Sequence, residues 1–225
     1  MYKYVKRLLD IIISICFLVV AIIPMLLIAI AIKLDSKGPV LFKQKRTGYK
    51  GKEFNLYKFR SMSYNNDYSD TSKENEFTRV GKFIRKYSLD ELPQVLNILF
   101  KNDMSWIGPR PWVPEYYKNF TKYQKRRCDV KPGITGLAQC SGRNNLTVFD
   151  KINYDIEYVD NISLLLDIKI VFKTIKAILK KEGVEISKLG IKEEIDQLHD
   201  NYIYVTGSIP VIDERNLEEL SNNNA

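Results

Sequence analysis

The chain has 225 residues, enough to bury a hydrophobic core and to form one domain of ordinary size with added segments. Its formal net charge of +8 is unevenly placed: residues 1–60 hold twelve basic and three acidic side chains, whereas residues 182–225 hold three basic and ten acidic ones. A single histidine, His199, argues against a histidine metal site or a Ser-His triad, and three cysteines without paired spacing indicate a reducing compartment without a disulfide framework.

The first predicted element is an apolar run from Ile11 to Ile32, interrupted only by Ser14 and Pro24. As an α-helix with a rise of about 1.5 Å per residue it would reach roughly 33 Å, which matches the hydrocarbon core of a bilayer. Basic residues flank both ends, so the positive-inside rule favours neither orientation. Pro24 removes a backbone donor and kinks a helix. These features favour a re-entrant membrane helix-hairpin, with a full span as the alternative.

The soluble part begins with alternating apolar and polar residues over 40–46 and 53–60, which predict a β-hairpin. A polar stretch, Tyr64–Glu76, is predicted to be a mobile loop. Helices are predicted over 78–86, 89–100, 114–127, 147–160 and 163–181. The predicted fold class is therefore α+β, mostly helical with one β-hairpin near the start of the soluble domain. The predicted organisation is an anchor at 1–36, a catalytic domain at 37–186 and an acidic tail at 187–225.

The last predicted helix carries a stripe of lysines spaced four, three and four residues apart, namely Lys169, Lys173, Lys176 and Lys180. Apolar residues fill most of the opposite side, which is typical of a core helix with a solvated face or of a helix in the membrane interface. The apolar run near the amino terminus favours the interface. Asp167 lies on the apolar side, where it is expected either to face the amide end of the helix or to pair with an arginine of the site.

Two adjacent carboxylates, Asp90 and Glu91, lie at the predicted start of a helix. The structural interpretation is a capping box of Ser88 with Glu91, or Asp90 as the N-cap. The chemical interpretation is a pair that acts on an anionic substrate. The predicted membrane anchor, the arginines and the glycine-rich stretch elsewhere in the sequence favour the chemical interpretation, and capping remains an alternative.

Two further stretches are predicted to contribute to a site. In Gly108-Pro-Arg-Pro111 two prolines bracket Arg110 and stiffen the backbone around it, although a plain turn with a solvated arginine fits equally well. The stretch 131–144 has the glycine content of a loop that lets backbone approach a ligand. It lacks the GxGxxG and GxxxxGK[ST] patterns, so neither a dinucleotide fold nor a P-loop is predicted.

Together the motifs resemble the bacterial sugar transferase family, specifically the small monotopic phosphoglycosyl transferases. The resemblance covers roughly residues 1–185 and rests on Gly38-Pro-Val-Leu-Phe, Leu56-Tyr-Lys-Phe-Arg-Ser-Met62, Ser88-Leu-Asp-Glu-Leu-Pro-Gln94, Asp103-Met-Ser, Gly108-Pro-Arg-Pro111, Lys131-Pro-Gly-Ile-Thr-Gly136, Ala138-Gln139, Gly142-Arg-Asn144 and Leu166-Asp-Ile-Lys169. Pro24 matches the helix-breaking proline of the family's re-entrant helix, whereas Ile23 stands where a serine often precedes it.

The resemblance implies that a UDP-sugar gives its phosphosugar to polyprenol (undecaprenyl) phosphate, leaving UMP. It implies Asp90 as the nucleophile, Glu91 as its partner in proton handling or positioning, and Mg²⁺ as the cofactor. It also implies a place in the bacterial inner membrane with the soluble domain on the cytoplasmic face, in contact with membrane lipid.

Elementary chemistry adds two expectations to this resemblance. A carboxylate at a helix N-terminus is expected to stay ionised, and Mg²⁺ bound to Asp90 would screen the two like charges. Guanidinium groups suit phosphate oxygens, so the predicted diphosphate ligands are Arg85, Arg110 and Arg143, with Lys58 and Arg60 as further candidates.

Two other functions compete with this one. A basic membrane-surface scaffold or nucleic-acid binder would explain the amino-terminal charge but not Asp90-Glu91, whereas the favoured function needs no nucleic acid. Direct glycosyl transfer to polyprenol phosphate would release UDP instead of UMP. The sequence names neither the sugar nor the oligomeric state, and a homodimer is left open.

Overall fold

The computed structural model describes residues 2–63, 77–142 and 146–179. The predicted loop Tyr64–Glu76, the predicted ligand Arg143 and the acidic tail 187–225 lie outside these residues. The chain forms two compact units, which are described separately. The first comprises Met1–Arg46 and Phe54–Met104, and the second comprises Thr47–Glu53 and Ser105–Ala225.

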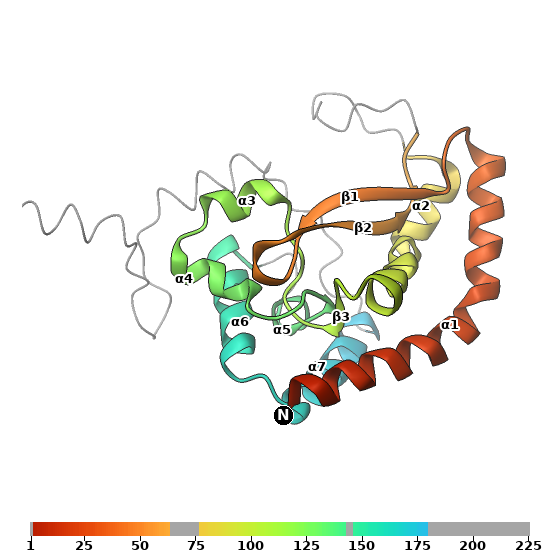
Figure 1. Cartoon of the computed structure of the whole chain (residues 1–225). Helices are drawn as coiled ribbons and strands as arrows, with labels where there is room; N and C mark the ends of the chain where they lie inside the picture. The colour runs from red at the N-terminus through yellow and green to blue at the C-terminus, as the bar shows by residue number, and fades with distance from the viewer. Residues whose placement is uncertain (1, 64–76, 143–145, 180–225) are drawn as a thin grey trace, which may run out of the picture. The chain divides into compact units, whose positions relative to one another are not determined.

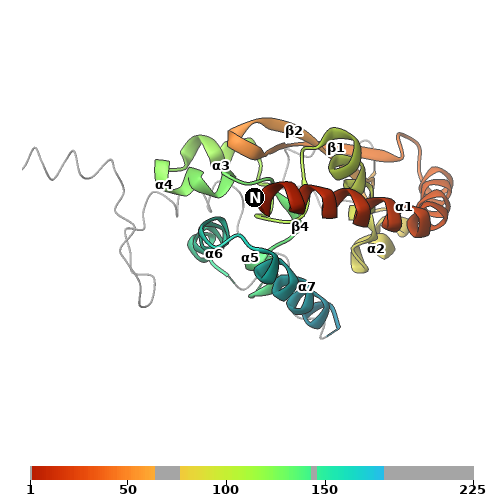
Figure 2. The ribbon, with the colours of Figure 1, turned by 60° about the horizontal axis from the view of Figure 1, so that its bottom comes forward.

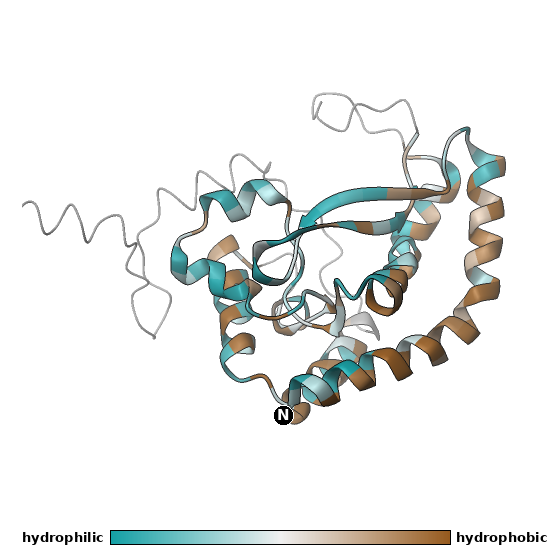
Figure 3. Ribbon diagram, in the orientation of Figure 1, coloured by the Kyte–Doolittle hydropathy of each residue, from teal (hydrophilic) through white to brown (hydrophobic). Residues whose placement is uncertain are grey.

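The first unit opens with α1 (Tyr2–Asp35), a single helix that contains Pro24 and bends along its length (Figure 1). It is apolar over most of that length (Figure 3), and among the described residues it is the one helix long and apolar enough to cross a membrane. Apolar side chains along it are exposed, with Val19 and Val20 at 71% and 77%. Such exposure suits a lipid environment rather than water.

Both ends of α1 are tied to the first unit. Near the start, Arg7 Nη1 donates to the carbonyl oxygen of Ile98 at 2.8 Å. At the end, the Asp35 carboxylate accepts from the backbone N–H of Val80 at 2.9 Å. Ile32, 1% exposed, packs there in the core of the unit.

The predicted β-hairpin is confirmed as β1 (Leu41–Thr47) and β2 (Glu53–Phe59). A short 3-10 turn, η1 (Tyr49–Gly51), joins the two strands. The free side of β2 is bonded by Asn97, whose side chain is fully buried. Asn97 Oδ1 accepts from the backbone N–H of Tyr57 at 3.0 Å, and Asn97 Nδ2 donates to the carbonyl of Asn55 at 2.7 Å. The Asn97 side chain thus makes the two hydrogen bonds to β2 that a neighbouring strand would otherwise make.

The helix predicted over 78–86 is confirmed as α2 (Arg79–Lys86), with Thr78 as its N-cap accepting from Gly81 N–H. The helix predicted over 89–100 is confirmed as a helical segment, but it is not a regular α-helix. The chain instead forms a 3-10 helix, η2 (Leu89–Gln94), followed by a π-helical turn, η3 (Asn97–Lys101). Pro93 lies inside η2, where its missing N–H and its ring oppose regular α-helical bonding.

The second unit contains a parallel strand pair that the sequence did not predict. β3 (Ser105–Ile107) pairs with β4 (Gly133–Thr135), so that Ser105 is opposite Gly133 and Ile107 opposite Thr135. A short helix, α5 (Leu137–Cys140), follows β4. The stretch from Lys131 is therefore not a plain loop as predicted. Pairing between strands this far apart in sequence leaves no local signal.

The single helix predicted over 114–127 is wrong. The chain forms α3 (Pro114–Asn119), α4 (Lys122–Lys125) and a 3-10 turn, η4 (Arg126–Cys128). Phe120 is extended, and Thr121 starts the second helix with a complete capping box to Gln124. The capping box at Thr121 therefore explains why the predicted helix is broken in its middle.

The last two helices are confirmed as α6 (Val148–Asp160) and α7 (Leu164–Leu179). α5 contacts both of them (Figure 2). Asp167, in the first turn of α7, is buried and accepts a hydrogen bond from the Tyr158 hydroxyl at 2.7 Å. Asp167 thus joins α6 to α7.

Candidate active site

The turn that carries Asp90 has an unusual backbone. Ser88 adopts the left-handed conformation, with φ 54° and ψ 24°, and its side chain makes no capping bond. The predicted capping box of Ser88 with Glu91 is therefore wrong, and so is Asp90 as the N-cap, because Asp90 lies inside η2. A left-handed residue other than glycine costs about 1–2 kcal/mol, and such strain gathers at functional sites.

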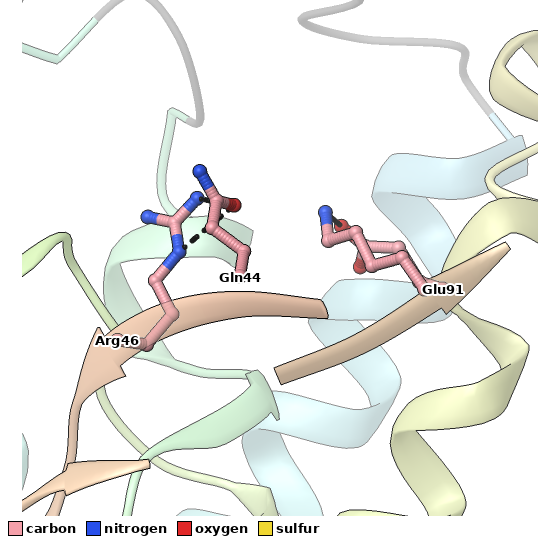
Figure 4. A network of polar contacts seen from close by, with 4 residues as sticks. Gln44, Arg46 and Glu91 are labelled. Atoms are coloured by element: carbon pink, nitrogen blue, oxygen red, sulfur yellow. Dashed lines mark hydrogen bonds and ion pairs between the residues drawn. The ribbon is translucent and has the colours of Figure 1, made fainter. Parts of the chain in front are cut away.

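Glu91 is bound by a lysine of the hairpin instead of capping the helix. Lys58 Nζ, on β2, donates to Glu91 Oε1 at 2.9 Å, and both side chains are mostly buried, at 17% and 20% exposed. Figure 4 shows Glu91 on the same side of the hairpin as Gln44 and Arg46 of β1. Arg46 Nε and Nη2 donate to Gln44 Oε1 at 3.1 and 2.5 Å. Gln44 and Arg46 were not singled out from the sequence. The available signal was their spacing, because residues two apart on a predicted strand lie on the same face.

Asp90 is half-buried, and this burial raises the pKa of its carboxyl above the usual value. Lys58 opposes the rise, Glu91 adds to it, and Arg85 opposes it again. The direction is opposite to the expected effect of a helix N-terminus. The loss of hydration on burial outweighs the stabilisation that a helix N-terminus gives to a carboxylate, because η2 is only six residues long.

Two predicted anion ligands of the first unit have different surroundings. Arg85 is exposed on the last turn of α2, with its guanidinium 4.7 Å from the centre of the Phe77 ring. Arg60 is 2% exposed and donates to the carbonyls of Ser36 and Lys37, which fixes the end of β2 to the end of α1. Arg85 can reach a ligand from this position, whereas the guanidinium of Arg60 faces backbone.

Arg110 belongs to the second unit and is exposed between two buried prolines, Pro109 and Pro111. Two hydrogen bonds to β4 fix the backbone that directly precedes Arg110. Gly108 N–H donates to the carbonyl of Thr135, and Gly133 N–H donates to the carbonyl of Pro109, both at 2.9 Å. The Gly108–Pro111 segment is therefore held rigidly against β4.

The glycines of this region make that close contact possible. A Cβ on Gly133 would collide with the backbone N of Gly108, and a Cβ on Gly136 would collide with the carbonyl of Gly108. These two glycines were predicted to let backbone approach a ligand. In the structure they let one backbone segment approach another. The third glycine of the predicted loop, Gly142, has φ 156° and lies against Leu146.

Among the described residues, no group of three or more His, Cys, Asp and Glu side chains is placed to hold a metal ion. Mg²⁺ commonly uses only one or two carboxylates and completes its shell with waters and substrate phosphates. The Asp90 carboxylate fits such a site, in which one protein carboxylate and a phosphate substrate share the ion, whereas Glu91 is already bound to Lys58. The described residues do not form a cage that holds the metal by protein groups alone.

The Asp90–Glu91 carboxylate pair, with Lys58 and Arg85 beside it, thus lies in the same unit as the long apolar helix α1. Residues 1–181 match the family described as bacterial sugar transferase. The chain belongs to that family, as the motifs predicted.

Several named sugar transferases are similar to this chain in sequence. An uncharacterized sugar transferase, EpsL, of Bacillus subtilis (strain 168) is 43% identical over 182 residues, which cover 80% of this chain and 90% of that protein. The UDP-glucose:undecaprenyl-phosphate glucose-1-phosphate transferase of Klebsiella pneumoniae is 44% identical over 76% of this chain. The undecaprenyl-phosphate galactose phosphotransferase of Salmonella typhimurium is 38% identical over 80% of it. The matches span 39% and 42% of the latter two proteins.

Proposed function

We propose that this chain transfers a phosphosugar from a UDP-sugar to polyprenol phosphate, giving polyprenol diphosphosugar and UMP. The observation that carries the proposal is Asp90 on a strained turn, beside the Lys58–Glu91 ion pair and Arg85. The printed names of the Klebsiella and Salmonella relatives describe sugar phosphate transfer to undecaprenyl phosphate, which supports the same reaction here. This transfer is the first membrane step in assembly of a polysaccharide or glycoconjugate.

In the proposed chemistry Asp90 attacks the phosphorus that carries the sugar. A bond forms between a carboxylate oxygen and phosphorus, the phosphorus–oxygen bond to UMP breaks, and UMP leaves with the electron pair. A phosphate oxygen of polyprenol phosphate then attacks the same phosphorus and frees the carboxylate. Burial raises the pKa of Asp90 and hence its basicity, which favours nucleophilic attack once the group is ionised.

The neighbours of Asp90 have separate tasks in this scheme. Lys58 and Arg85 supply positive charge for the phosphate oxygens and favour the ionised carboxylate. Glu91 holds Lys58 in place and is the candidate for proton handling. Mg²⁺, when bound at Asp90, would neutralise charge on the diphosphate and on the leaving UMP. Arg110 is also a proposed ligand of the diphosphate.

The proposed membrane arrangement is re-entrant, at the cytoplasmic face of the inner membrane. Support comes from the two ends of α1, since Arg7 and Asp35 both bond to backbone of the same unit. Ends tied to one compact unit belong on one side of a bilayer. Basic residues at both flanks favour the cytoplasmic side. α7 also exposes apolar side chains for contact with membrane lipid, namely Leu164, Leu165, Ile168, Val171, Phe172 and Ile175.

The product nucleotide tests the reaction. The full-length protein in detergent is incubated with Mg²⁺, polyprenol phosphate and each of a panel of UDP-sugars, and the released nucleotide is separated chromatographically. The proposal expects UMP from at least one sugar, and no UMP from Asp90→Asn. Glu157→Gln, which changes an exposed carboxylate on α6, is the matched control and should retain activity. Release of UDP instead would favour direct glycosyl transfer, and full activity of Asp90→Asn would end the proposed role of that residue.

A further inference from the structure

A buried ion pair lies in the second unit. Arg127 in η4 and Asp155 in α6 have side chains that are each 2% exposed. Arg127 Nε and Nη2 donate to the same oxygen, Asp155 Oδ2, at 3.0 and 2.5 Å. The guanidinium also lies over two aromatic rings, 4.5 Å from the centre of Trp112 and 5.8 Å from that of Phe120.

This ion pair is expected to contribute little to the stability of the folded state. Taking two charges out of water carries a large desolvation cost, and this cost is recovered only when every polar atom is hydrogen-bonded. Here Asp155 Oδ1 is buried and has no hydrogen-bond partner among the described residues. Burial also raises the pKa of Asp155, against the attraction of Arg127. An apolar pair would fill the same space between α6 and η4 without that cost.

A third hydrogen bond of Arg127 points to another role. Its Nη2 donates to the backbone carbonyl of Arg110 at 2.7 Å. The neighbouring backbone is already bonded at Gly108 and Pro109, and the carbonyl of Trp112 accepts from Thr47 N–H at 2.8 Å. Arg127 supplies the bond at Arg110 itself, the exposed residue of this segment.

We propose that Arg127, held in place by Asp155, is a positioning residue that fixes the backbone of Arg110 and so aims its side chain at the substrate diphosphate. This inference rests on the proposed function, in which Arg110 binds that diphosphate. A guanidinium suits the task, because Nε and Nη2 together hold the carboxylate while Nη2 also bonds the carbonyl of Arg110. Lysine keeps the charge, but its single nitrogen cannot reproduce bonds that start from two guanidinium nitrogens.

The chain provides a matched control one residue away. Arg126, also in η4, forms an ion pair with Asp160 of α6, and these side chains are 41% and 46% exposed. This pair joins the same two elements with the same residue types but has no contact with Arg110 that the structure describes. A general effect of the η4–α6 connection should appear equally in Arg126→Lys and in Arg127→Lys.

The experiment is a double-mutant cycle read by binding of UDP, a diphosphate probe that needs no turnover, to the full-length protein in detergent. We expect Arg127→Lys to raise the Kd about tenfold, the size of one lost charge-assisted contact. Arg126→Lys should leave the Kd unchanged. In an Arg110→Gln background, Arg127→Lys should add nothing further, because residues that act through one another are not additive. In turnover, the change should appear in KM for the UDP-sugar rather than in kcat.

Each alternative outcome has its own meaning. Equal effects of Arg127→Lys with and without Arg110, or equal effects of Arg126→Lys and Arg127→Lys, would overturn the positioning role and leave the proposed function intact. An unchanged Kd in Arg110→Gln would instead remove Arg110 from the proposed function, and the positioning role with it. Asp155→Asn keeps the size of the side chain and serves as the second variant if Arg127→Lys does not fold. It is expected to show the same dependence on Arg110.

Discussion

Asp90→Asn should stabilise the protein while abolishing its activity. Folding raises the pKa of Asp90, chiefly because the carboxylate loses hydration, and Glu91 adds repulsion. The folded state therefore binds the Asp90 proton more tightly than the unfolded state does. By linkage, this group lowers stability as pH rises from the unfolded pKa through the folded pKa, and the whole penalty is present above that window. Asparagine fills nearly the same volume without a charge.

The expected gain is about 0.5–1 kcal/mol at neutral pH, the lower part of the range for single stabilising substitutions, because Asp90 is only half-buried and Lys58 compensates its charge in part. For a chain of this size that gain corresponds to a rise in Tm of roughly 1–4 °C. The assay is thermal unfolding of the full-length protein in detergent between about pH 4.5 and 8, with Glu157→Gln as control. The difference between Asp90→Asn and wild type should shrink as pH falls. An asparagine variant that is less stable at neutral pH, or a difference independent of pH, would refute the reasoning.

Three further substitutions test the surroundings of the site. Lys58→Met removes the ion pair with Glu91 and a charge that lowers the pKa of Asp90, so kcat/KM should fall at least about tenfold and the acidic limb of the pH–rate profile should move to higher pH; an unmoved limb would contradict this. Gly133→Ala forces a Cβ against the backbone of Gly108 and should cost about 1–3 kcal/mol of unfolding free energy, measured by denaturant titration, whereas an unchanged midpoint would argue against the close approach. Ser88→Gly relieves the left-handed strain and should raise stability by up to about 1 kcal/mol while lowering kcat; a loss of stability would show that the serine side chain matters more than the backbone.

Local patterns predicted several elements correctly. Alternation identified β1 and β2, and Thr78 and Thr147 were correctly placed at the starts of α2 and α6. These signals depend on nearest neighbours in the sequence, so they are readable without tertiary structure. The motifs also identified the family, which the comparisons confirm over residues 1–181.

Competition between local signals and tertiary contacts explains the errors. Ser88 and Glu91 have the spacing of a capping box, but Glu91 bonds to Lys58, 33 residues earlier in the chain. The glycines near Gly133 read as a ligand loop, but they pack against the distant Gly108 segment. Contacts between residues so far apart in the sequence leave no periodic pattern in it. The roles of Asp90, Arg85 and Arg110 in catalysis stay predictions.

Trapping the covalent intermediate tests the central claim most directly. The full-length protein is mixed with Mg²⁺ and an active UDP-sugar without polyprenol phosphate, quenched in acid, and its intact mass and peptide masses are measured. The proposed function predicts a mass increase of one phosphosugar located on Asp90, loss of that adduct when polyprenol phosphate is added before the quench, and no adduct in Asp90→Asn. An adduct on another residue, or UMP release by an Asp90→Asn variant at the wild-type rate, would contradict it.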